Sequence, residues 1–133
     1  NRTVQASEFF TAADNGLAHT WHGRVWMNPP YAQPLIQQFA DKLVDEWLAE
    51  HVTEAIVLVN NATETNAFQT MFKHAVAVAF PRGRIRYLDH TGTPANTPLQ
   101  GQAFLYFAPP ERIPEFRKRF DAFGVTGGGY AAR

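Results

Sequence analysis

A pair of adjacent prolines, Pro29 and Pro30, is the feature that most restricts how this chain can fold. Proline lacks a backbone N–H and pushes the residue before it out of helical geometry, so neither a helix nor a central strand can continue through this point. The short β-type run of residues 24–27 must therefore end here. Together these residues predict a strand that stops abruptly and leads into a stiff, extended connection.

The sequence after the prolines alternates between helical and strand patterns. Apolar residues recur at helical spacing over 35–48, with polar residues between them, which predicts an amphipathic helix. The continuous apolar run 55–59 is typical of a strand buried on both faces of a parallel sheet. Strand, helix and strand in this order predict a right-handed crossover unit with two parallel strands.

The alternation continues to the end of the chain. Further predicted elements are a helix over 64–74, strands over 75–80, 84–88 and 102–107, a loop over 89–101 and a helix over 111–123. The glycine triplet 127–129 predicts a flexible end. We therefore expect one domain over residues 1–124 and a flexible tail over 125–133.

The composition excludes several kinds of chemistry. Cysteine is absent, which removes disulfides, thiolate zinc sites and every mechanism with a Cys nucleophile. His19 and His22 have no partners at metal-ligand spacing, so we expect no metal site. No apolar run approaches the roughly 20 residues that span a bilayer, and we expect a soluble, cytoplasmic protein without membrane contact. Lys plus Arg and Asp plus Glu balance at 12 each, so contact with nucleic acid needs a local basic patch.

The tetrapeptide Asn28-Pro29-Pro30-Tyr31 has the properties of a site that holds an amine. The prolines present carbonyls without competing N–H donors, and the Asn28 amide oxygen adds another acceptor. Two hydrogen bonds to an exocyclic amine would leave its lone pair free to attack a methyl sulfonium directly. Tyr31 offers a flat face on which a flipped base can stack. The alternative is a rigid strand-to-helix turn that happens to contain two prolines.

The chain resembles the small, often phage-encoded DNA N6-adenine methyltransferases of the class I S-adenosylmethionine-dependent fold. The resemblance runs over residues 1–108 and rests on the tetrapeptide and on the order and spacing of these stretches: Phe9-Phe10-Thr11, Asp14-Asn15-Gly16-Leu17, Trp21, Gly23-Arg24-Val25-Trp26, Arg82-Gly83-Arg84 and Gly101-Gln102-Ala103-Phe104. It implies a Rossmann-like α/β fold with a mostly parallel sheet, helices on both faces and an antiparallel C-terminal strand. It also implies a bacterial host cell and a phage or prophage gene.

The resemblance assigns the cofactor S-adenosylmethionine to one group of residues: Phe10, Thr11, Asp14, Leu17 and Asn28. Asp14 matches an acidic residue that accepts a hydrogen bond from the cofactor's adenine amine in related enzymes. Alternatively, Asp14 only begins the turn before Asn15-Gly16. The family's first cofactor motif should precede Phe9 and is not found there, so we expect this chain to lack the first strand and the cofactor loop.

The resemblance implies transfer of a methyl group to adenine N6 in double-stranded DNA, with Asn28, Pro29, Pro30 and Tyr31 as the catalytic residues. Arg82, Arg84 and Arg86 form a basic stretch that can follow a phosphate backbone, although a solvated face is the alternative. Cytosine C5 is excluded as a target because it requires a Cys nucleophile. Cytosine N4, a protein glutamine amide and a catalytically inactive DNA- or partner-binding relative remain open.

Overall fold

A computed structural model describes residues 5–11, 14–86, 88–89, 91–94 and 100–132 of the chain. The strands and α-helices are, in chain order, β1 Gly23–Met27, α1 Leu35–Leu48, β2 Val52–Asn60, α2 Asn66–Phe72, β3 Ala77–Pro81, β4 Gln102–Phe107, α3 Ile113–Phe120 and β5 Gly124–Gly128. Three short 3-10 turns accompany them: η1 Gly16–Ala18, η2 Pro110–Arg112 and η3 Tyr130–Ala132. No helix among the described residues combines the length and apolar character needed to cross a membrane.

The five strands form one sheet in the order β1-β2-β4-β3-β5. Only β1 and β2 pair in parallel, and the other three neighbouring pairs are antiparallel. The prediction of a mostly parallel sheet is therefore wrong. The reason is that β4 enters between β2 and β3 in the opposite direction, and β5 adds a further antiparallel pair at the edge. The strands β1, β2 and β3 still run in one common direction, whereas β4 and β5 run in the opposite direction.

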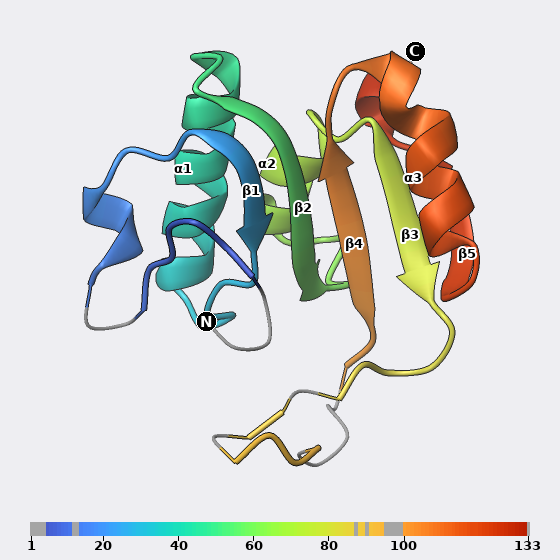
Figure 1. Ribbon diagram of the computed structural model, residues 1–133, viewed down its shortest axis with the longest axis horizontal. Helices are drawn as coiled ribbons and strands as arrows, with labels where there is room; N and C mark the ends of the chain where they lie inside the picture. Colours follow the sequence, from blue (N-terminus) through green and yellow to red (C-terminus); the bar gives the residue numbers. More distant parts are fainter. Residues whose placement is uncertain (1–4, 12–13, 87, 90, 95–99, 133) are drawn as a thin grey trace.

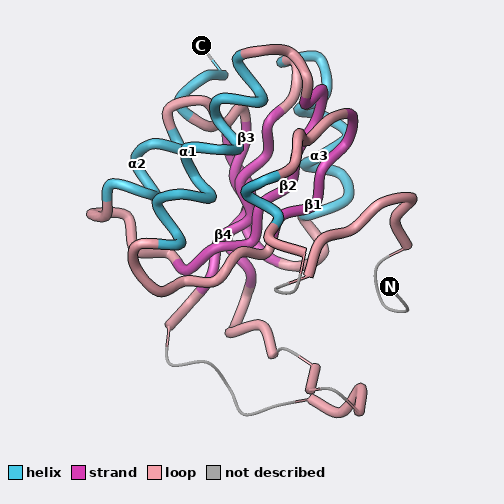
Figure 2. Tube along the Cα trace, turned by 90° about the vertical axis from the view of Figure 1, so that its left-hand side faces the viewer, coloured by secondary structure: helices cyan, strands magenta, loops and turns pink. Residues whose placement is uncertain are grey.

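Helices cover both faces of the sheet, as predicted. In Figures 1 and 2, α1 and α2 lie on one side of the strands and α3 lies on the other. Alternate residues of β4 serve the two sides: Leu105 and Phe107 belong to the core beneath α1 and α2, whereas Tyr106 stacks on Phe116 of α3 at 4.6 Å between ring centroids. The result is a three-layer α/β/α arrangement.

Local patterns set the helix boundaries. The predicted helix 35–48 coincides with α1, because its amphipathic stripe packs Leu43 and Val44 into the core. The second helix is shorter than predicted and begins after Thr65, whose hydroxyl accepts a hydrogen bond from the Phe68 N–H at 3.3 Å. This bond is an N-cap, which satisfies a donor that the first helical turn leaves free.

The predicted strand 84–88 is not formed by the described residues of this segment, which leave out Tyr87. β4 already pairs with β2 on one side and β3 on the other, so it has no free side with which these residues could pair. Instead, Gly83 turns the chain at φ 79°, and the Ile85 N–H donates to a side chain, Gln102 Oε1, at 3.1 Å. Of this segment, Leu88 makes only an isolated bridge with Pro94.

The predicted flexible tail is also wrong, because Gly124–Gly128 form β5 and pair with β3. The glycines allow close packing here: a Cβ on Gly124 would lie 2.0 Å from the Phe80 carbonyl oxygen, and one on Gly129 would lie 2.3 Å from that of Ala75. Any larger residue would therefore collide with the backbone of the neighbouring segment. Glycine serves close backbone approach at these positions.

Candidate active site at the carboxyl ends of the strands

The carboxyl ends of β1, β2 and β3 lie at one edge of the sheet because the three strands share a direction. Asn28 follows β1, Asn61 follows β2 and Arg82 follows β3. In Figure 1, the described parts of the long connection from β3 to β4 lie beyond this same edge. The fold thus gathers the proline tetrapeptide and the arginine stretch, which are far apart in sequence, at one edge of the sheet.

The proline tetrapeptide is held from one side and open on the other. Pro29 is buried, whereas Asn28 and Pro30 are exposed and Tyr31 is half-buried. The chain then turns through residues 32–34 and enters α1 at Leu35. A buried proline with fixed φ gives the exposed Asn28 amide a rigid support. The segment therefore presents hydrogen-bond acceptors to solvent with little conformational freedom.

Tyr31 connects Asn28 to the neighbouring strand. Its hydroxyl lies 2.9 Å from Asn28 Oδ1 and 3.0 Å from the carbonyl oxygen of Leu58 in β2. Its ring packs against the core beneath α1, so only part of the ring is accessible. The structure thus brings two of the predicted catalytic residues into direct contact, and it adds the Leu58 carbonyl, which the sequence did not indicate.

Asp14 closes a local turn with Thr11. The carboxylate oxygen Oδ2 accepts from the Thr11 N–H at 2.9 Å and from the Thr11 hydroxyl at 2.8 Å, and the Asp14 N–H donates to the Thr11 carbonyl at 3.0 Å. The backbone and side-chain hydrogen bonds from Thr11 lower the pKa of Asp14 below 3.8. An aspartate carboxylate is ionised at neutral pH, and an ionised carboxylate has further acceptor sites at Oδ1. This geometry is compatible with both the cofactor role and the turn-forming role.

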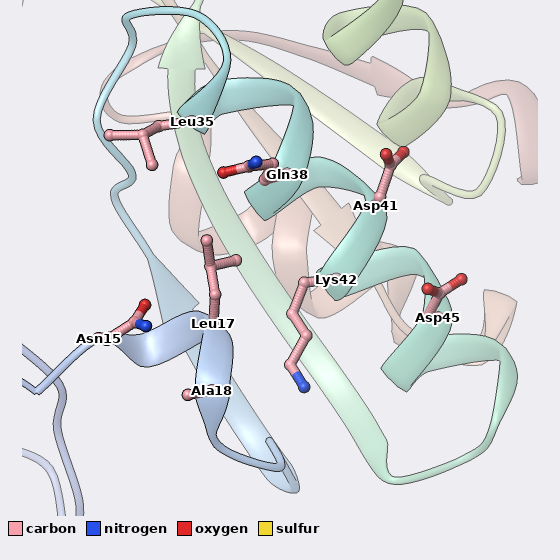
Figure 3. Close-up of a pocket in the computed structure, with 8 residues that line it drawn as sticks. All are labelled: Asn15, Leu17, Ala18, Leu35, Gln38, Asp41, Lys42 and Asp45. Carbon is pink, nitrogen blue, oxygen red and sulfur yellow. The ribbon is translucent and has the colours of Figure 1, made fainter.

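A hollow of about 700 Å³ lies between η1 and α1. Its lining residues are Asn15, Leu17, Ala18, Leu35, Gln38, Asp41, Lys42 and Asp45. Figure 3 shows the side chains of Leu17 and Lys42 on opposite sides of this space. Of the predicted cofactor residues, only Leu17 lines the hollow.

Phe10 lies next to η1, which forms one wall of the hollow. Its ring stacks on the ring of His19 with centroids 4.6 Å apart, and its Cβ would lie 3.3 Å from a Cβ on Gly16. These contacts hold the segment that carries Thr11 and Asp14 against η1. The aromatic pair therefore supports the turn, whatever further contact Phe10 makes.

The three arginines are exposed, and their segment is fixed by a buried glutamine. Gln102 is only 4% exposed, and its amide accepts from the Ile85 N–H at 3.1 Å and donates to the Gln100 carbonyl at 2.9 Å. The Arg82 N–H donates to the Phe123 carbonyl at 2.7 Å. Gln102 therefore ties together both ends of the long β3–β4 connection. A polar residue at the start of an apolar strand was the one sequence signal for this role.

The sequence predicts no metal site, and the side chains that usually bind metal ions are those of His, Cys, Asp and Glu. Among the described residues, no three such side chains come together in a way that could hold a metal ion. Of the tryptophans of β1 and the segment before it, Trp21 is buried at 7% exposure, whereas Trp26 is 43% exposed.

Comparison with known proteins adds a family relationship. The chain matches the family described as DNA N-6-adenine-methyltransferase (Dam) over residues 1–114. It is 27% identical over 109 residues to a protein named DNA N-6-adenine-methyltransferase from Haemophilus phage HP1 (strain HP1c1), an alignment that covers 80% of this chain and 61% of the relative. The chain thus spans about three fifths of the length of that relative. No solved structure matches the chain. All the candidate site residues named above lie within the matched region.

Proposed function

The chain belongs to the DNA N-6-adenine-methyltransferase (Dam) family, and we propose that the protein transfers a methyl group from S-adenosylmethionine to the N6 amine of adenine in double-stranded DNA. The observation that carries this proposal is the exposed Asn28 amide, which lies next to the buried Pro29 and 2.9 Å from the Tyr31 hydroxyl, at the edge where three strands end. An amine-binding site requires a rigid hydrogen-bond acceptor, and open α/β sheets bind ligands at the carboxyl ends of their strands.

The proposed chemistry needs two acceptors for one amine. The Asn28 amide oxygen and the Pro29 carbonyl accept from the two N–H groups of the amine, which holds the nitrogen with its lone pair free. When bound, S-adenosylmethionine would supply an electrophilic methyl group: the N–C bond would form as the methyl–sulfur bond breaks to leave a neutral thioether, and the nitrogen would release one proton to solvent, without a covalent enzyme intermediate. Because Pro29 and Pro30 stiffen the backbone at this point, little backbone reorganisation is needed when charge develops on the nitrogen.

The target base must leave the helix to reach this site. Tyr31 is the aromatic group next to Asn28, and its accessible part offers a stacking surface for the flipped adenine. Pro30 is exposed between these two residues and adds an apolar contact without an N–H that would compete for acceptors. The four residues then act as one unit that stacks on the base and holds its amine.

The residues around η1 fit the adenosine part of the cofactor. Asp14 is an ionised acceptor with free capacity, which suits an adenine amine, and Leu17 presents an apolar side chain to the adjacent hollow. Phe10 and Thr11 hold this segment in place through the contacts described above. We assign these four residues, together with Asn28, to cofactor binding. The common direction of β1, β2 and β3 supports a Rossmann-like arrangement around the cofactor.

Arg82, Arg84 and Arg86 are proposed to contact DNA phosphates. They are exposed and follow β3 at the same edge as Asn28, so a duplex bound there would pass over both. The similarity to a phage protein supports a phage or prophage gene whose product acts in a bacterial cell.

The test is methyl transfer by the complete protein. Calorimetric titration with S-adenosylmethionine, followed by a radiolabelled-methyl assay on DNA, RNA and protein, should give cofactor binding and label in DNA alone. Digestion of the labelled DNA should then release N6-methyldeoxyadenosine. Label on cytosine N4 or on a protein glutamine would overturn the assignment of the target. DNA binding without cofactor binding would identify an inactive relative.

A further inference from the structure

The Tyr31 hydroxyl lies between two oxygens that can both accept a hydrogen bond. Asn28 Oδ1 is 2.9 Å away and the Leu58 carbonyl oxygen is 3.0 Å away. A tyrosine hydroxyl has one hydrogen, so it can donate fully to only one of them at a time. The position of that hydrogen decides how the Asn28 amide is turned.

The two acceptors differ in their access to water. Leu58 is buried at 4% exposure in a central strand, whereas Asn28 is exposed. The pairing of β1 with β2 ends at Met27 opposite Val57, and Pro29 has no N–H with which to extend it. A buried carbonyl without a donor is costly, but an exposed amide can bond to water. The hydroxyl hydrogen is therefore favoured on the Leu58 carbonyl.

The Tyr31 oxygen then faces Asn28 as an acceptor. A half-turn of the Asn28 amide exchanges its oxygen and nitrogen with little movement of the other atoms, and it places the NH₂ group against the Tyr31 oxygen. In the structure Asn28 Oδ1 faces the Tyr31 hydroxyl, and this half-turn would direct the amide oxygen away from Tyr31, towards solvent. In the opposite orientation the NH₂ group would point outward, where it would repel an incoming amine and attract a carbonyl.

We propose that the Tyr31 hydroxyl is a positioning group that turns the Asn28 amide oxygen outward, so that the site accepts a base with an amine and rejects one with a carbonyl at the same position. This inference rests on the proposed function, because it concerns how the same site selects adenine. It gives Tyr31 a second role, separate from stacking, that depends on the hydroxyl and not on the ring.

Tyr31→Phe in the complete protein tests the role, because it keeps the ring and removes the hydroxyl. The substrate is the duplex in which the methylated adenine has been located, and the competitor carries hypoxanthine, which has a carbonyl in place of the amine, at that position. We expect kcat to fall about fivefold to tenfold, with the affinity for S-adenosylmethionine unchanged. The preference for adenine over hypoxanthine in DNA binding should also fall about fivefold.

A second tyrosine provides the matched control. The Tyr106 hydroxyl bonds to Glu54 on the α3 side of the sheet, so Tyr106→Phe removes a hydroxyl without touching Asn28. This variant should keep both kcat and the base preference of the wild type. If Tyr31→Phe behaves like Tyr106→Phe in both measurements, the inference is wrong.

Amide exchange separates failure of this inference from failure of the proposed function. In the wild type, the Asn28 side-chain NH₂ should exchange with water more slowly than in Tyr31→Phe and show a nuclear Overhauser contact to the Tyr31 ring. This measurement needs no DNA and no activity. Absence of methyl transfer would contradict the proposed function, whereas an Asn28 NH₂ with equal exchange in both proteins would contradict only the role of the hydroxyl.

Discussion

The Trp21 backbone N–H donates a hydrogen bond of 2.5 Å to the Glu46 carboxylate, 25 residues further along the chain. The Trp21 indole N–H donates to the Gly16 carbonyl at 2.9 Å, and Lys42 lies over the Trp21 ring at 5.9 Å from its centroid. These contacts join η1 to α1, the two walls of the hollow between them. Glu46 is therefore an anchor for the segment that carries Asp14 and Leu17.

Glu46 should make stability depend on pH. Burial raises the pKa of its carboxyl, but the hydrogen bonds from the Trp21 N–H and the His51 ring outweigh burial and hold the pKa below 4.5. Since the folded-state pKa lies below the unfolded value, this stabilisation is present above pH 4.5 and is lost as the pH falls through the lowered pKa. Urea denaturation of Glu46→Gln should show a shallower loss of stability on acidification than the wild type. Glu115→Gln, which breaks only an exposed pair with Arg119, should keep the wild-type pH profile.

Replacement of the proposed amine acceptor should stop catalysis without unfolding the protein. Asn28 is exposed, so Asn28→Ala should leave the melting temperature unchanged and the cofactor affinity within a few-fold. Loss of one acceptor in the transition state costs about 3 kcal/mol, or about a hundredfold in rate. Asn66→Ala, at an exposed asparagine on α2, is the control in the same methyl-transfer assay. Turnover by Asn28→Ala within threefold of the wild type would contradict the assignment.

Removal of the Tyr31 ring should weaken binding of the flipped base. Tyr31→Ala loses the stacking surface, which contributes about 1–3 kcal/mol for a base on an aromatic ring. Affinity should therefore fall about tenfold or more for duplexes with either adenine or hypoxanthine at the target position, measured by fluorescence anisotropy. If Tyr31→Ala binds both duplexes as tightly as the wild type does, stacking on Tyr31 is excluded.

The arginine stretch should govern the salt dependence of DNA binding. Replacing Arg82, Arg84 and Arg86 together by Gln should flatten the plot of log affinity against log salt by about one unit for each lost phosphate contact. The matched control replaces three exposed cations of α3 by Gln: Arg117, Lys118 and Arg119. Equal slopes for the two triple variants would identify the first stretch as an ordinary solvated surface.

The buried amide of Gln102 should hold the β3–β4 connection in place. Gln102→Leu leaves the Ile85 N–H and the Gln100 carbonyl without their partner and should cost about 1–3 kcal/mol. Trypsin should then cleave after Arg84 and Arg86 faster than in the wild type, which mass spectrometry can measure. Gln69→Leu removes an exposed amide that donates to the Thr63 carbonyl, and it should leave the cleavage rate unchanged. Unchanged cleavage in Gln102→Leu would show that other contacts fix the loop.

The sequence predicted the parts of the fold that depend only on residues close together in the sequence. The stripe over 35–48 and the stop at Pro29 are local properties, and both are found in the structure. The segment 84–88 has an alternating pattern, but both sides of the following strand β4 are already paired, and that depends on where β4 inserts. The glycines from Gly124 onward have the composition of a tail, yet the approach of β3 turns the same lack of side chains into a packing requirement.

The same distinction applies to the candidate site. A strand that ends in two prolines placed Asn28 and Tyr31 correctly beyond β1, because chain geometry alone requires it. The partners that complete the site come from other elements: the Leu58 carbonyl from β2 and the Gln102 amide from β4. No local pattern relates these residues to Asn28, so only the packed structure reveals them.

The place of β4 in the middle of the sheet also determines when the protein can fold during synthesis. β2 pairs with β4, and Ala55 lies opposite Phe107, so the central ladder cannot form until residue 107 has left the ribosome. Until then β3 has no neighbour on that side, and β1, α1 and β2 form at most a partial unit with an open apolar edge. Contacts this distant in sequence slow folding and expose strand edges that can aggregate. The nascent chain should therefore become resistant to protease only once β4 has been inserted.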